Sequence, residues 1–129
     1  MRSFPEIRQN AGYLVDNPNT SNNAIVTQSG SDNESFITQG GGDPFGGAGG
    51  PTSDNNLANV TQTGIDGYSS VSQSGDLHSA TLIQGGTDNE STIDQSGSSN
   101  TATVNQTSNS NISSVTQGGS GNVASVTQN

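Results

Sequence analysis

The sequence predicts an all-β fold: a parallel β-solenoid of 22-residue coils, with two strands in each coil and two facing parallel sheets. Three observations support this fold class. Glutamine recurs every 11 residues along most of the chain, an aliphatic residue stands two positions before each glutamine, and alanine and serine alternate four positions before it. Repetition at a short fixed pitch is typical of solenoids, in which each coil packs only on its neighbours.

The repeat occupies residues 22–129, which we expect to form one solenoid domain. Its glutamine column is Gln28, Gln39, Gln62, Gln73, Gln84, Gln95, Gln106, Gln117 and Gln128. The alanine and aliphatic positions, which we expect to form an apolar core, are Ala24, Val26, Ile37, Ala58, Val60, Val71, Ala80, Leu82, Ile93, Ala102, Val104, Val115, Ala124 and Val126. Because alanine arms alternate with serine arms, two arms make one coil, and stacked coils place the two kinds of arm in different sheets.

Each arm has the two-residue alternation of a β-strand. In the first arm Asn22, Ala24, Val26 and Gln28 fall on one side, and the residues between them fall on the other. We expect the regular set to be buried, because burial enforces register and solvent does not. Buried amides need hydrogen-bond partners, and identical amides stacked in register can bond to one another. We therefore expect an amide ladder of the glutamines and of Asn22, Asn33, Asn56, Asn89, Asn100, Asn111 and Asn122.

Two residues depart from the asparagine column, Gly67 and His78. His78 is the only histidine, and we interpret it as a substituted ladder residue rather than a metal ligand or a base. Serine is abundant, but a serine nucleophile needs a positioned base and no base recurs beside it. The sequence therefore predicts no enzyme activity, no metal site and no cofactor.

The linkers between arms contain a glycine two residues after glutamine, where a positive φ would reverse the chain. These turn glycines are Gly30, Gly41, Gly64, Gly75, Gly86, Gly97 and Gly119. The fold would also stack Asp32, Asp66 and Asp88 into one acidic column. Two interpretations of this column remain open: solvated turn acids, or a like-charge column that opposes stacking until it is protonated or binds Ca²⁺.

Two segments interrupt the regular array. Residues 1–21 form an N-terminal segment in which 11–17 keeps the 11-residue pitch, and we expect a degenerate edge strand there. Between Gln39 and Asn56 lie 16 residues instead of the usual four, rich in glycine and proline. Since the alanine–serine alternation resumes unbroken afterwards, residues 40–55 are expected to form a loop inserted at a turn.

Composition and charge exclude several classes of function. A quarter of the residues are apolar and 10% are charged, values that by themselves favour disorder, but disorder does not explain the strict register. The formal charge of −9, with Arg2 and Arg8 as the only basic residues, argues against binding to nucleic acid or to an anionic membrane. No apolar run is long enough to span a membrane, and no signal peptide is evident, so we expect an exported form to have lost its leader.

The repeat resembles a known family. The segments Gln73-x-Gly75-x-x-His78-x-Ala80-x-x-x-Gln84 and Gln95-x-Gly97-x-x-Asn100-x-Ala102-x-x-x-Gln106 are similar to the curlin repeat, Gln-x-Gly-x-x-Asn-x-Ala-x-x-x-Gln. Curlins are subunits of curli, the extracellular amyloid fibres of bacterial biofilms. The resemblance implies export to the cell surface through an outer-membrane curli pore, a nucleator subunit as partner, and templated polymerisation into cross-β fibrils.

The repeat also predicts the mode of self-association. The last arm, 122–128, and the first, 22–28 or 11–17, have matching patterns and no dissimilar cap, so we expect them to meet head to tail in a homopolymer. The alternative is a monomeric β-solenoid that binds a surface ligand, such as a glycan or, given the outward threonines, ice.

Overall fold

The computed structural model describes residues 4–9, 22–40 and 55–129, and in these ranges the only regular secondary structure is β-strand. The ten strands are β1 (Phe4–Gln9), β2 (Asn23–Gln28), β3 (Glu34–Gly40), β4 (Leu57–Gln62), β5 (Tyr68–Asp76), β6 (Ser79–Gln84), β7 (Glu90–Ser98), β8 (Thr101–Gln106), β9 (Ile112–Gln117) and β10 (Val123–Gln128). No helix in these ranges is long and apolar enough to cross a membrane.

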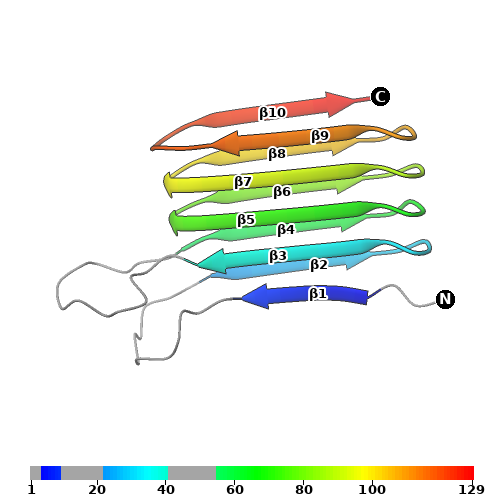
Figure 1. Cartoon of the computed structure of the whole chain (residues 1–129), viewed down its shortest axis with the longest axis horizontal. Helices are drawn as coiled ribbons and strands as arrows, with labels where there is room; N and C mark the ends of the chain where they lie inside the picture. The colour runs from blue at the N-terminus through cyan, green and yellow to red at the C-terminus, as the bar shows by residue number, and fades with distance from the viewer. Residues whose placement is uncertain (1–3, 10–21, 41–54) are drawn as a thin grey trace.

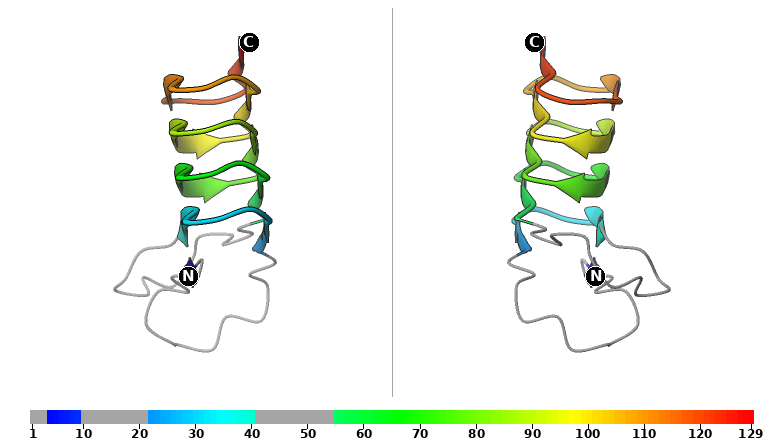
Figure 2. Two further views of the ribbon diagram at one scale, coloured as in Figure 1. Left: turned by 90° about the vertical axis from the view of Figure 1, so that its right-hand side faces the viewer. Right: turned by 90° about the vertical axis from the view of Figure 1, so that its left-hand side faces the viewer.

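The strands form two parallel five-stranded sheets. Sheet A has the order β1-β3-β5-β7-β9, and sheet B has the order β2-β4-β6-β8-β10. Successive strands therefore alternate between the sheets, and the arrows of the two sheets run in opposite directions (Figure 1). Figure 2 shows the coils stacked one above another from the N-terminal to the C-terminal end. The predicted solenoid of 22-residue coils with two strands per coil is confirmed.

Like residues pair with like residues across the coils. In sheet B the alanine, aliphatic and glutamine positions of β4 lie opposite those of β6, as in Ala58 to Ala80 and Gln62 to Gln84. In sheet A the serine arms pair in the same way, as in Ser69 to Ser91. The alanine and serine arms thus occupy different sheets, as the 22-residue period predicts. This register is fixed because a one-residue slip would turn every buried side chain outward.

The core lies between the sheets and is thin. Its buried apolar residues are Ile37, Ala58, Val60, Val71, Ala80, Leu82, Ile93, Ala102, Val104 and Val115. Ala24 and Val26 in β2, and Ala124 and Val126 in β10, are only partly buried because they belong to the outermost strands of sheet B. An incoming strand on either side would complete their burial.

The edge strand of sheet A is formed by residues for which the sequence made no prediction. β1 comprises residues 4–9 and pairs with β3, so that Ile7 lies opposite Ile37 and Gln9 opposite Gln39. The predicted strand at 11–17 lies outside the described residues. The Ile-x-Gln spacing of Ile7 and Gln9 matches that of the arms, but Gln9 stands 19 residues before Gln28 and so is out of phase with the 11-residue pitch.

Most of the predicted loop at 40–55 also lies outside the described residues. Gly40 ends β3, and the chain rejoins the described part at Asn55. On either side of this segment the coils stack without a shift, since β2 pairs with β4 and β3 pairs with β5 in the standard register. The insertion therefore adds length to one connection without disturbing the array.

Candidate functional site: the amide spine and its ends

The glutamines of sheet B form a continuous chain of side-chain hydrogen bonds. Nε2 of each glutamine donates to Oε1 of the next one toward the C-terminus, at 2.7 Å, 2.8 Å, 2.9 Å and 2.9 Å. The members in order are Gln28, Gln62, Gln84, Gln106 and Gln128. Sheet A carries a second chain in the same direction, in which Gln39, Gln73, Gln95 and Gln117 are joined at 2.9 Å, 2.9 Å and 2.8 Å.

The second N–H of each glutamine connects the two sheets. Gln73 in β5 donates to the backbone carbonyl of Leu57 in β4 at 3.0 Å, and Gln84 in β6 donates to that of Tyr68 in β5 at 3.0 Å. The same bond recurs along the described coils up to Gln128, which donates to the carbonyl of Ile112 at 3.1 Å. The glutamines therefore join successive coils and also the facing sheets, which explains how fully buried amides are tolerated.

The two glutamine chains together form what we call the amide spine. Because every side-chain bond in it runs in one direction, its two ends differ. At the N-terminal end, the buried Oε1 atoms of Gln28 and Gln39 have no hydrogen-bond partner among the described residues. At the C-terminal end, Gln117 and Gln128 each make the bond to the facing sheet but have no further glutamine to receive the second N–H. One end of the described spine thus offers acceptors and the other offers donors.

The asparagine column works differently from the expected side-chain ladder. Oδ1 of Asn100 accepts the backbone N–H of Asn122 in the next coil at 2.9 Å. Nδ2 of Asn100 donates to the carbonyl of Ser96 in its own turn at 2.8 Å and to that of Gly119 in the next coil at 3.1 Å. Asn33, Asn56 and Asn89 follow the same scheme with backbone partners. Asparagine here bonds to the backbone and fastens each turn to the turn above it.

His78 reproduces this scheme with an imidazole ring. The side chain is 1% exposed, Nδ1 accepts the backbone N–H of Asn100 at 3.2 Å, and Nε2 lies 3.1 Å from the carbonyl of Ser74. Both bonds require a neutral ring with the proton on Nε2. His78 therefore makes the bond to its own turn and accepts the N–H of the next coil, but it does not make the donation to the next turn that Asn100 makes.

Gly67 is the other departure, and it leaves the column incomplete. Its backbone N–H donates to Oδ1 of Asn33 at 2.9 Å, like any other member. Having no side chain, it offers no acceptor to the coil above, where Asn89 stands. It also supplies no amide to fasten its own turn. The column is thus interrupted between Gly67 and Asn89, at the starts of β5 and β7.

The turn glycines are required mainly by close packing of successive turns. A Cβ on Gly64 would lie 1.9 Å from the carbonyl oxygen of Gly86, and one on Gly75 would lie 1.9 Å from that of Gly97. Gly75 also has a φ of 112°, whereas Gly64 is not among the residues with positive φ. The expectation of a positive φ at every turn glycine is therefore wrong at Gly64, where contact alone excludes a side chain. Gly41 lies outside the described residues.

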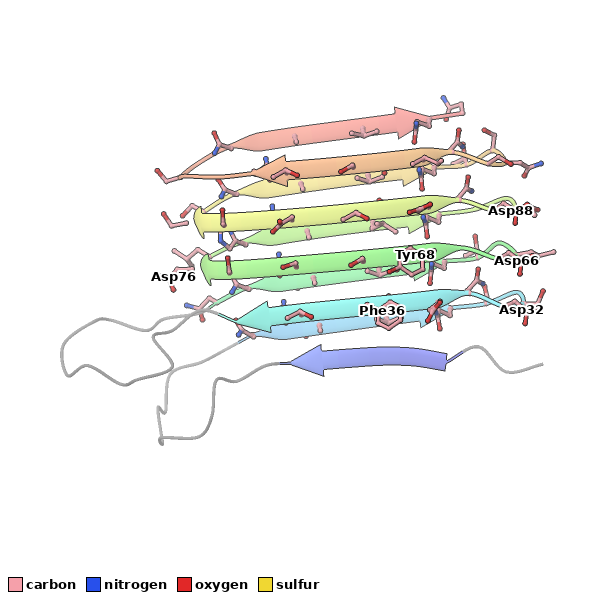
Figure 3. The ribbon with its side chains drawn as sticks, viewed as in Figure 1. Asp32, Phe36, Asp66, Tyr68, Asp76 and Asp88 are labelled. Carbon is pink, nitrogen blue, oxygen red and sulfur yellow. The ribbon has the colours of Figure 1, made fainter. Side chains whose placement is uncertain are left out.

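The acidic column lies on one edge of the solenoid. Asp32, Asp66 and Asp88 stand one above another at the turns that lead from sheet B to sheet A, while Asp76 lies on the opposite edge (Figure 3). All three column residues are in the left-handed region, with φ of 56°, 54° and 56°. Aspartate adopts this conformation more readily than most residues, which accounts for its recurrence. In the part of the chain that the structure describes, no three His, Cys, Asp or Glu side chains are grouped to hold a metal ion.

Comparison with known proteins agrees with this architecture. The family model for the curlin associated repeat matches residues 20–41 and 68–97, which include β2, β3, β5, β6 and nearly all of β7. These two stretches therefore have the sequence pattern of the curlin associated repeat. The resemblance drawn from the glutamine, glycine and alanine positions is thereby confirmed. No curated protein and no solved structure matches the chain.

Proposed function

We propose that this chain is the structural subunit of an extracellular, curli-like amyloid fibre that grows by head-to-tail stacking of solenoids and serves in biofilm matrix and adhesion. The observation that carries the proposal is the directional amide spine, whose two ends are complementary. Stacking the N-terminal end of one copy on the C-terminal end of another would let the donor of Gln128 meet the unpaired Oε1 of Gln28 at the edge of sheet B, while β9 would pair with β1 at the edge of sheet A. A contact between unlike ends does not close on itself, so repeated addition makes a filament.

Backbone and core support the same contact. The outer edges of β9 and β10 present parallel-strand hydrogen-bonding groups that have no partner strand in the described residues. Exposed strand edges are templates for pairing with another chain. The half-buried Ala124 and Val126 would be covered by the same addition. Each added copy would therefore bury apolar surface, pair two strand edges and extend the glutamine chain of sheet B.

The remaining parts of the proposal come from the family resemblance. Curlin-repeat chains of this kind would reach the cell surface through an outer-membrane pore and begin polymerisation on a nucleator. The buried amides of the spine are hydrogen-bonded to one another and to the backbone, which supports a structural role and not a catalytic one. The repeat arms from Asn22 to Gln128 contain no lysine or arginine, Arg8 lying in β1 outside the repeat, and this favours a fibre-forming subunit over a basic nucleator.

Elongation from preformed seeds tests the proposal. Gln128→Glu keeps an oxygen to accept the bond from Gln106 but removes the donor that would meet the next copy. We expect this variant to elongate at least about tenfold more slowly on wild-type seeds, since one buried unpaired group costs ~1–3 kcal/mol. Thr127→Glu is the matched control, because it adds the same charge to the same strand on the outward face.

Electron microscopy and fibre diffraction supply the direct evidence. Wild-type filaments should give a meridional reflection near ~4.7–4.8 Å and an equatorial one near ~10 Å. A wild-type protein that stays folded and monomeric would overturn the proposal and favour the surface-binding alternative. Equal slowing by Gln128→Glu and Thr127→Glu would overturn the role of the spine ends.

A further inference from the structure

The outer faces of the two sheets differ in charge. Sheet B presents three outward positions on each of its five strands, and none of these side chains is acidic or basic. Sheet A presents Glu34, Glu90 and Asp94 among its outward positions. In β1 of sheet A, Glu6 lies opposite Phe36 and Arg8 opposite Thr38. The remaining acids among the described residues lie on the turn edges, at Asp32, Asp66, Asp88 and Asp76. In a chain of net charge −9, sheet B is thus the one broad side of the described solenoid without charge.

Sheet B also exposes apolar side chains on this uncharged surface. Ile25, Leu57 and Ile83 are 43%, 39% and 40% exposed, and Val123 at the C-terminal end is 79% exposed. Threonine and serine fill most of the other outward positions, including Thr81 at the centre of the face. Flat, uncharged β-surfaces of this composition form dry contacts between paired sheets in cross-β assemblies.

We infer that the outer face of sheet B is a lateral interface, on which a second filament of this same chain packs face to face. This inference rests on the proposed function. Two copies that approach by their turn edges or by sheet A bring like charges together within the ~8 Å screening length of physiological salt. Approach by sheet B avoids that repulsion, and it covers apolar side chains on both partners.

The size of the face determines when pairing occurs. Five strands at ~4.8 Å and six-residue strands at ~3.3 Å per residue give a face of roughly 24 by 20 Å, or about 480 Å². A stable interface needs about 800 Å² from each partner, so one subunit is too small and two or more stacked subunits suffice. Single subunits should therefore remain unpaired, and filaments should pair once a few copies have stacked.

Mass per length of filaments tests the inference, because pairing doubles it. Thr81→Glu places one carboxylate at the centre of sheet B, and successive copies along a filament would be roughly 24 Å apart, beyond the screening length. We expect this variant to elongate on seeds at the wild-type rate but to form filaments of half the wild-type mass per length. Ser70→Glu is the matched control on the middle outward position of sheet A, and it should keep the wild-type value.

Several outcomes would overturn the lateral interface. Wild-type filaments with the mass of a single subunit stack would do so, as would Thr81→Glu filaments that remain paired. Loss of pairing in both variants would show that any added charge separates the filaments, whichever face carries it. These results leave the proposed function intact, whereas absence of wild-type filaments overturns the proposed function and this inference with it.

Discussion

The glutamine and asparagine columns are chemically alike and are used differently. Both are columns of primary amides: glutamine stands at the end of every arm, and asparagine at the start of every arm except those that begin with Gly67 and His78. Glutamine bonds side chain to side chain and continues from coil to coil, as between Gln84 and Gln106. Asparagine bonds to backbone groups of the turns, as between Asn100 and Asn122.

The difference follows from position and length. Glutamine stands at the end of a strand, and its extra methylene carries the amide clear of the backbone, where it meets an identical amide. Asparagine stands beside the turn, where backbone N–H and C=O groups have lost their ladder partners and must be satisfied locally. The glutamine column therefore joins successive coils through side-chain bonds, and the asparagine column stabilises the backbone of each turn. Four substitutions test this division of roles, from the largest expected effect to the smallest.

The largest effect is expected from Gln84→Leu. This change leaves Nε2 of Gln62, Oε1 of Gln106 and the carbonyl of Tyr68 without their partner. Since each buried unpaired group costs ~1–3 kcal/mol, we expect the free energy of unfolding to fall by about 3–5 kcal/mol. Urea unfolding of freshly prepared monomer measures it. Ile83→Thr, on the exposed side of the same strand, is the control, and an equal loss there would contradict a special role for the glutamine.

A smaller loss is expected from Asn100→Asp. The new carboxylate can still accept the N–H of Asn122, but it faces the carbonyls of Ser96 and Gly119 with an oxygen instead of a donor. We expect a loss of about 2–4 kcal/mol at neutral pH. The protonated acid regains one donor, so the folded state raises the pKa of this carboxyl above its ordinary value. The loss should therefore shrink as the pH falls from neutrality to the ordinary carboxyl pKa, and should not change further below it. Unfolding curves at two pH values measure the pH dependence of this loss. Asn109→Asp, on a turn, is the control. A loss that does not depend on pH would argue against the two carbonyl contacts.

Gly67→Asn should stabilise the solenoid. The position belongs to the asparagine column and does not have a positive φ, so a side chain is compatible with its backbone. The nearest obstacle to a Cβ is the side-chain oxygen of Asn33 at 2.9 Å, which can move. Restoring the turn contacts and removing a flexible glycine should add about 1 kcal/mol to the free energy of unfolding. Gly67→Ala separates the two contributions, and an asparagine variant no more stable than the alanine one would show that the column gains nothing there.

The smallest effect concerns the turn edge outside both columns. Replacing Asp32, Asp66 and Asp88 together by asparagine keeps a residue tolerant of the left-handed conformation and removes three stacked charges. We expect elongation to be a few times faster at low salt and equal to wild type at high salt, where the charges are screened. Equal rates at low salt would remove the idea that the acidic column opposes stacking.

Sequence periodicity alone determined the coil, the two sheets and the register. Glutamine recurs every 11 residues on both sides of the insertion and alanine alternates with serine, and only a two-strand coil of 22 residues places like residues on like residues. The sequence also identified the buried face. Each strand has two faces, and only one of them carries the same residue types from arm to arm, as burial requires.

Tertiary structure decided what depends on atoms from a neighbouring coil. Three features involve residues 19 or 22 positions away in the chain: the bonds from Asn100 to the next coil, the contact that excludes a side chain at Gly64, and the direction of the glutamine chains. The pairing of β1 with β3 was missed because residues 4–9 are out of phase with the repeat, and pairing in space does not require equal spacing along the chain. The uncharged face of sheet B emerged only when alternate arms were assigned to different sheets, since each arm by itself shows too few outward residues to reveal a surface.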